Sequence, residues 1–210
     1  EMVQNDPYGY VVIVGDMMNM GLKTAKSNVY EEVLTPMQQK ELCFEVLSPI
    51  ADRILAGCSG NHEYRAVKEV GMNPLYDVFC RLRIEDRYRE NVCYIKLTVG
   101  KQGKNPNTYG VVLTHGSSKS KDEKWTYGVD GCDCFISGHT HDADHKPFGK
   151  IRMDLSHNKV KLVGYQHIVV LPFQRYGGYA VRGKYMPNSL GQFQRITFDG
   201  STKKVGYNYN

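Results

Sequence analysis

Four short apolar runs, each followed by Asp, Asn or His with glycine alongside, constrain the fold of this 210-residue chain most strongly. Residues 10–14 (YVVIV) and 53–58 (RILAGC) are continuously apolar, which is typical of strands buried on both faces. The runs at 108–115 and 132–137 end in the same way. Because glycine lets the backbone turn tightly, each run predicts a core strand that ends in a sharp turn bearing a polar side chain.

Helical segments alternate with these strands. Thr35 as N-cap, Pro36 at the first helical position and Gln38 three residues after the cap predict a helix that ends near Ser48. Two further helices are expected at 63–70 and 74–83, and further strands at 91–99, 159–163, 166–172, 192–198 and 203–209. This order predicts an α/β core with an antiparallel, β-rich tail, in a single domain over residues 1–210.

Composition narrows the class of protein. The formal charge of +5 suits an anionic substrate, and no apolar run is long enough to cross a bilayer, so we expect no membrane partner. The six cysteines form no C-x-x-C pair, which predicts reduced thiols and a cytoplasmic protein. The first residues read as the end of a helix, so we expect part of the domain to lie upstream of this segment.

Polar residues should collect at one edge of the sheet, because ligands bind at the carboxyl ends of strands in open α/β sheets. Carboxylate, imidazole and amide groups without thiolate favour Mn²⁺, Fe or Zn²⁺. His139 and His141 stand two residues apart, so each is placed to serve a different ion. The residues predicted at this edge are Asp16, Asn61, His62, His115, His139 and His141.

At these positions the sequence resembles the calcineurin-like metallophosphoesterases. The motifs are GDMMN (15–19), GNHE (60–63), THG (114–116) and GHTH (138–141), in the order of that family and over most of the chain. The amino-acid sequence of residues 10–45 and of the C-terminal tail is also similar to that of phosphoesterases from phage and prophage genomes. The resemblance implies an α/β (α+β) fold, a two-sheet β-sandwich flanked by helices in four layers.

The resemblance also implies a role for each residue. Asp16 would bridge two divalent metal ions, Mn²⁺ first among them, and His141 would bind the first ion. His62 would face the phosphate and protonate the leaving group, while a hydroxide held by both ions attacks phosphorus in a phosphomonoester or phosphodiester, including a nucleotide or a nucleic-acid end. The second ion would be completed by Asn61, His115 and His139.

Two departures from the family pattern leave an alternative open. The D-x-H motif, which supplies ligands of the first ion, is absent from residues 1–15. In that family the motif lies a strand and a helix upstream, so the resemblance implies that this segment lacks the first strand and helix of the domain. Asn19 stands where family members often carry the Asp that pairs with the G-N-H histidine, so we expect Asn19 to hold a less basic His62. The alternative is a catalytically impaired binding or scaffold protein on the same fold. A mononuclear zinc hydrolase of amides or esters ranks third, because Asn61 is an unusual zinc ligand.

A few residues admit two interpretations. Lys119 and Lys121 either steer a phosphate or lie in a solvated loop of mixed charge. Tyr176 and Tyr179 either cover the site or pack on the core, and we favour packing. His145 is near enough to the GHTH motif to be a partner of its histidines.

Overall fold

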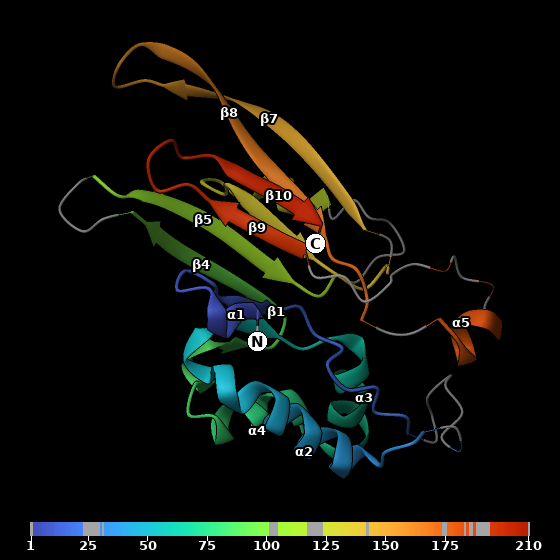
Figure 1. Cartoon of the computed structure of the whole chain (residues 1–210). Helices are drawn as coiled ribbons and strands as arrows, with labels where there is room; N and C mark the ends of the chain where they lie inside the picture. The colour runs from blue at the N-terminus through green and yellow to red at the C-terminus, as the bar shows by residue number, and fades with distance from the viewer. Residues whose placement is uncertain are drawn as a thin grey trace. The chain divides into compact units, whose positions relative to one another are not determined.

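The chain is a mixed α+β protein that divides into two compact units. The computed structural model describes residues 2–22, 30, 32–100, 105–116, 124–141, 143–173, 176–182, 184, 187 and 194–209. The first unit comprises Glu1–Cys93 and Leu113–Ser117, and the second comprises Tyr94–Val112 and Ser118–Asn210. Helices predominate in the first unit and strands in the second (Figure 1). The α+β class is confirmed, and the single domain over 1–210 stays a prediction.

A three-stranded parallel sheet lies at the centre of the first unit. Strands β1 (Val11–Ile13), β2 (Ile54–Cys58) and β3 (Tyr88–Arg89) follow one another in that order, and Ile13 is opposite Gly57 in the register. Because β1 and β2 run in the same direction, their carboxyl ends meet at one edge of the sheet. The turns that carry Gly15-Asp16 and Gly60-Asn61 begin at this edge.

Helices surround this small sheet. They are α1 (Met2–Asn5), α2 (Pro36–Leu47), η2 (Ser48–Arg53), α3 (Asn61–Val70), α4 (Pro74–Arg81) and η3 (Glu85–Arg87), where η marks a 3₁₀ helix. The predicted capping box of α2 is confirmed: Thr35 N donates to Gln38 Oε1 at 2.9 Å, and Thr35 Oγ1 accepts from Gln38 N at 3.3 Å. Apolar residues of strands and helices form one buried core, chiefly Ile13, Leu47, Ile54, Leu75, Val78 and Phe79.

Most of the second unit is a five-stranded sheet of order β4-β5-β6-β8-β7. Its strands are β4 (Val92–Val99), β5 (Asn107–Thr114), β6 (Cys134–Ser137), β7 (Asp144–Asp154) and β8 (Lys159–Val169), and the ends of β4 and β5 extend into the first unit. Strand β6 pairs with β8 in parallel, whereas β7 and β8 form a long antiparallel hairpin. The remaining elements are η4 (Lys124–Gly128), α5 (Gly178–Arg182) and an antiparallel pair, β9 (Gln194–Phe198) and β10 (Val205–Tyr209).

Two strand predictions in the second unit were wrong. Strand β8 is continuous where two strands were expected, because Gly164 pairs with Gly149 and keeps the ladder intact. Strand β7 was not predicted. Within the described part of the chain, no helix has the length and apolar character needed to cross a membrane.

Candidate metal centre

The turn after β1 and the turn after β2 approach each other so closely that both need glycine. Gly15 has φ +83°, and a Cβ on it would overlap the backbone of Gly60. A Cβ on Gly60 would in turn overlap the carboxylate of Asp16. The glycines of the G-D and G-N-H-E motifs are therefore explained by packing: they allow the Asp16 backbone to lie against the start of α3.

Glu63 ties these two turns together. Its carboxylate is fully buried, with Oε2 accepting from Asp16 N and Gly60 N at 2.9 Å each and Oε1 accepting from Met18 N at 3.1 Å. Burial, together with the charge of Asp16, raises the pKa of Glu63 despite these N–H donors. The sequence prediction gave Glu63 no role, although its position as third residue of α3 is that of a capping-box glutamate.

Asp16, Asn61 and His115 form one cluster in the first unit. His115 Nε2 lies 3.0 Å from Asn61 Oδ1 and 3.3 Å from Asp16 Oδ2. Two ligands bound to one ion at about 2.1 Å and at a right angle lie about 3 Å apart. The three atoms are thus spaced as neighbouring ligands of a single cation.

The orientation of His115 is fixed by the backbone. Its Nδ1 lies 2.7 Å from the carbonyl oxygen of Val14, so that Nδ1–H donates to this carbonyl and Nε2 faces Asp16 and Asn61. A backbone carbonyl is a common partner for the distal nitrogen of a metal-binding histidine. His115 is 6% exposed, which excludes most water from its ring.

The charges of the cluster stabilise each other. Burial opposes ionisation of Asp16, but the hydrogen bond and charge of His115, followed by the charge of His62, hold the pKa of Asp16 below its ordinary value. Burial likewise lowers the pKa of His115, and Asp16 more than offsets this, so the pKa of His115 is raised. The cluster therefore contains a carboxylate that stays ionised and is available to a cation.

The donor set fits a hard or borderline divalent cation. No three His, Cys, Asp or Glu side chains among the described residues are grouped so as to hold a metal ion. The cluster of Asp16, Asn61 and His115 has two such side chains and an amide oxygen as its third member. Carboxylate and amide oxygens with one imidazole nitrogen suit Mn²⁺, Fe²⁺ or Zn²⁺.

His62 borders the cluster as the second residue of α3. Its backbone N–H donates to Asp16 Oδ1 at 2.9 Å, and its ring Nε2 lies 3.6 Å from Asp16 Oδ2. The ring is largely buried and lies beside the carboxylate without a direct hydrogen bond to it at that distance.

Asn19 lies on the same turn but has other contacts. Its side-chain amide donates to Glu32, and its backbone carbonyl oxygen accepts from Arg65 Nη1 at 3.0 Å. Arg65 is on α3, so this bond attaches the end of the turn to the helix that carries His62. A direct role of Asn19 beside the His62 ring stays a prediction.

The other two predicted ligands, His139 and His141, belong to the turn after β6 in the second unit. Their φ angles are +69° and +57°, and Asp16 has φ +53°. The hydrogen bond from Thr140 N to Gly138 O, 2.8 Å, closes this turn. Left-handed backbone is uncommon for residues other than glycine, and such strain clusters at functional sites.

The residues with two interpretations are placed as follows. His145 Nε2 lies 2.7 Å from Gln166 Oε1, and its ring is 4.7 Å from that of Tyr207, so it packs between β8 and β10. Tyr176 is 46% exposed. The described part of the structure does not include Lys119, Lys121 or the side chain of Tyr179.

Comparison of the chain with models of known families, with curated proteins and with solved structures found no match in any of the three.

Proposed function

We propose that this protein is a metal-dependent phosphoric ester hydrolase. The observation that carries the proposal is the convergence of Asp16, Asn61 and His115, with ligand atoms 3.0 and 3.3 Å apart and His62 beside them. These residues come from three separate sequence motifs. Scattered polar turns would not bring a carboxylate, an amide oxygen and an imidazole nitrogen to one point.

The cluster would hold a divalent cation through Asp16 Oδ2, Asn61 Oδ1 and His115 Nε2. Such an ion, when bound, neutralises charge on a phosphoryl group and lowers the pKa of water. The residues contribute preorganisation: Val14 orients His115, and Glu63 and the His62 backbone hold Asp16 from both sides. The start of α3, with its partial positive charge, favours an anionic substrate at this position.

His62 would act as the proton donor for the leaving group. Its ring stands next to the Asp16 carboxylate, beside the cluster that would hold the cation. Because its backbone N–H is fixed on Asp16 Oδ1, the first turn of α3 cannot move independently of Asp16. A proton delivered from this ring would reach the oxygen of a departing alcohol, with either a monoester or a diester as substrate.

The full proposal extends to the second unit. His139 and His141 of the second unit would also be ligands of divalent ions, with Mn²⁺ preferred and Fe or Zn²⁺ as substitutes, as the resemblance to the calcineurin-like family implies. Substrates of this class include nucleotides and nucleic-acid ends. The strained backbone of the GHTH turn supports a functional role for these two histidines.

Metal content and hydrolysis, measured on the same samples, test this proposal. The metal-free protein is loaded with Mn²⁺ or Zn²⁺, freed of excess, and assayed with p-nitrophenyl phosphate and bis(p-nitrophenyl) phosphate. We expect Asn61→Ala to lose metal and turnover together, and His62→Asn to keep metal but lose turnover. His157→Asn, which changes an exposed histidine of the second unit, should match the wild type.

The two measurements, metal content and ester turnover, distinguish the enzyme from a binding or scaffold protein. Bound metal without turnover of either ester would favour the binding or scaffold protein. Failure of the wild-type protein to retain any metal ion would exclude the proposed chemistry. Turnover that survives Asn61→Ala and His62→Asn together would show that the reaction takes place elsewhere.

A further inference from the structure

The outer half of the β7–β8 hairpin has one apolar face and one charged face. In its register Ile151 is opposite Leu162, and Met153 is opposite Val160. Directly paired residues of an antiparallel ladder lie on the same face, and so do residues two apart along a strand. These four side chains therefore share one face. The opposite face carries the alternate rungs, including Arg152 opposite Lys161 and Asp154 opposite Lys159.

The apolar face is exposed to solvent. Ile151 is 77% exposed, Leu162 80%, Met153 69% and Val160 70%, and Leu155 in the adjoining turn is 81% exposed. A strand pair with strict apolar and polar alternation normally buries its apolar face. Figure 1 shows the hairpin extending outward beyond the other strands of its sheet. No part of the described second unit covers these five side chains.

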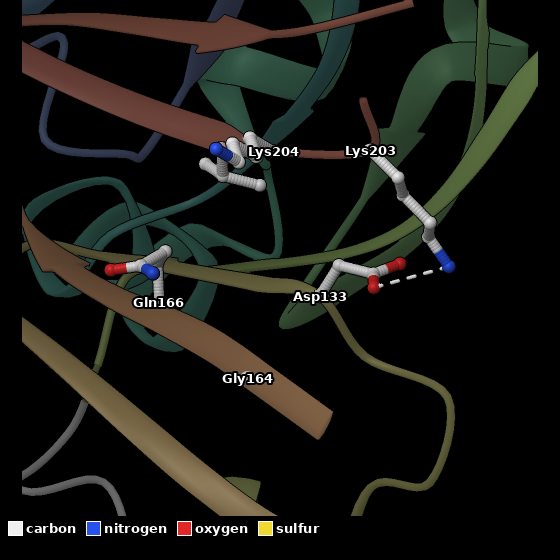
Figure 2. A pocket seen from close by; sticks show the side chains of 6 residues that line it. Asp133, Gly164, Gln166, Lys203 and Lys204 are labelled. Atoms are coloured by element: carbon white, nitrogen blue, oxygen red, sulfur yellow. Dashed lines mark ion pairs between the residues drawn. The ribbon is translucent and has the colours of Figure 1, made fainter. Parts of the chain in front are cut away.

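A basic cavity adjoins this face at its inner end. It measures about 370 Å³ and lies beside Gly164, the next residue inward from Leu162 on the same face of β8. Figure 2 shows Lys203, Lys204 and Asp133 around it, with Lys203 Nζ 3.4 Å from Asp133 Oδ1. The ion pair neutralises one lysine, so Lys204 brings a further positive charge to the same side as the apolar residues.

We propose that this side of the second unit, defined by Ile151, Met153, Val160, Leu162 and Lys204, docks on an anionic lipid surface. Apolar side chains beside lysines are the combination that binds such surfaces, because the former enter the acyl boundary and the latter meet lipid phosphates. This mode of contact requires no transmembrane segment, and it replaces the expectation from the sequence that the protein has no membrane partner.

Size and charge favour a lipid surface over a second copy of the chain. The five apolar side chains offer on the order of 300 Å² of apolar surface. Stable protein interfaces bury roughly 800 Å² per partner, of which roughly 450 Å² is apolar. The hairpin, residues 144–169, carries five Lys and Arg against two Asp, so two copies stacked on this face would also repel each other. An anionic bilayer has no such size requirement and attracts the same charges.

Vesicle flotation tests the proposal. The full chain is mixed with vesicles of phosphatidylcholine alone, or of equal parts phosphatidylcholine and phosphatidylglycerol, at low and high salt. We expect binding to the mixed vesicles and a decrease of tenfold or more in Ile151→Ser/Leu162→Ser. The matched control is Val33→Ser/Val70→Ser, two exposed aliphatic residues of the first unit, which should bind like the wild type. Circular dichroism verifies that both variants fold.

Substitution of Lys204 tests the contribution of charge to vesicle binding. Lys204→Glu should weaken binding to the mixed vesicles at low salt, whereas Lys96→Glu, an equal change at an exposed site of β4, should have less than a twofold effect. Equal flotation with both vesicle types, or wild-type flotation by Ile151→Ser/Leu162→Ser, would overturn the proposal. A dimer in light scattering that this pair of substitutions dissolves, without vesicle binding, would assign the face to a second copy instead. Hydrolysis of a soluble ester reports on the metal centre separately, so the two proposals fail independently.

Discussion

Replacing Glu63 with Gln should destabilise the first unit even though the two side chains have nearly the same shape. The Glu63 carboxylate accepts three backbone N–H groups, from Asp16, Met18 and Gly60, at 2.9 to 3.1 Å. A glutamine oxygen in the Oε2 position keeps two of these bonds. Its NH₂ group then faces Met18 N–H, so that two donors confront each other inside the protein.

The size of the effect follows from these contacts. A hydrogen bond to a charged acceptor contributes about 1.5–3 kcal/mol, a neutral one about 0.5–1.5 kcal/mol, and a buried unsatisfied donor costs about 1–3 kcal/mol. Glu63→Gln weakens two bonds, removes one and leaves two donors, Met18 N–H and the glutamine NH₂, facing each other without an acceptor. Relief of carboxylate burial and of repulsion from Asp16 offsets part of the loss. We expect a net decrease in the free energy of unfolding of about 2–3 kcal/mol.

Urea unfolding of the metal-free protein, followed by helical circular dichroism, measures this decrease. The signal reports on the first unit because α2, α3 and α4 are there. Glu69→Gln, at an exposed position of the same helix, is the matched control and should change the free energy of unfolding by less than about 0.5 kcal/mol. A Glu63→Gln variant as stable as Glu69→Gln would refute the assignment of Glu63 as the tie between the two turns.

Three further predictions concern neighbouring residues. Asn61→Ala should weaken Mn²⁺ binding at least about tenfold in calorimetry, while Asn61→Asp should retain it; equal affinity of all three proteins would remove Asn61 from the ligands. Gly60→Ala should displace the Asp16 carboxylate and cost about 1–3 kcal/mol of stability, and an unchanged urea midpoint would show that the turns do not touch. Burial raises the pKa of Tyr88 to about 12, opposed by hydrogen bonds from its neighbours. Because the folded pKa is raised above the unfolded value of about 10, the stability that the neutral phenol contributes is present below about pH 10 and is lost as the pH rises through 12. An ultraviolet titration of Tyr88 with a midpoint near 10 would contradict this prediction.

The sequence predicted those parts of the fold whose signals are local. The run 10–14 and the capping box at Thr35 are complete within a few residues, and both elements form as expected. Strand β7 was missed because its period-two pattern is interrupted by Pro147 and Gly149. As an edge strand, β7 tolerates proline, since an outward N–H needs no partner there. The apolar residues of its outer half are also exposed, so the expectation that apolar strand residues are buried does not apply to them.

The candidate site was predictable to the extent that it depends on strand direction. Parallel β1 and β2 place Asp16 and Asn61 at one edge, as the motif order indicated. The contact of Asn19 with Glu32 could not be read from the sequence, because it depends on how the segment after the turn folds back. Glu63 was missed for another reason: its helix-capping position was visible, but its two contacts beyond the helix, to Asp16 and Met18, are long-range.

Asp16 and the predicted ligands His139 and His141 are among nine non-glycine residues of the described chain that have positive φ. Asp16, His139 and His141 all adopt positive φ, which costs roughly 1–3 kcal/mol for a residue other than glycine. Glycine at any of the three positions would remove that cost, and glycine already stands beside each motif as Gly15 and Gly138. Six of the nine residues lie outside the predicted site, so a gain from the side chain has to be read from its contacts. At Asp16 that gain is visible, because the strained backbone directs the carboxylate to His115 and to the first turn of α3.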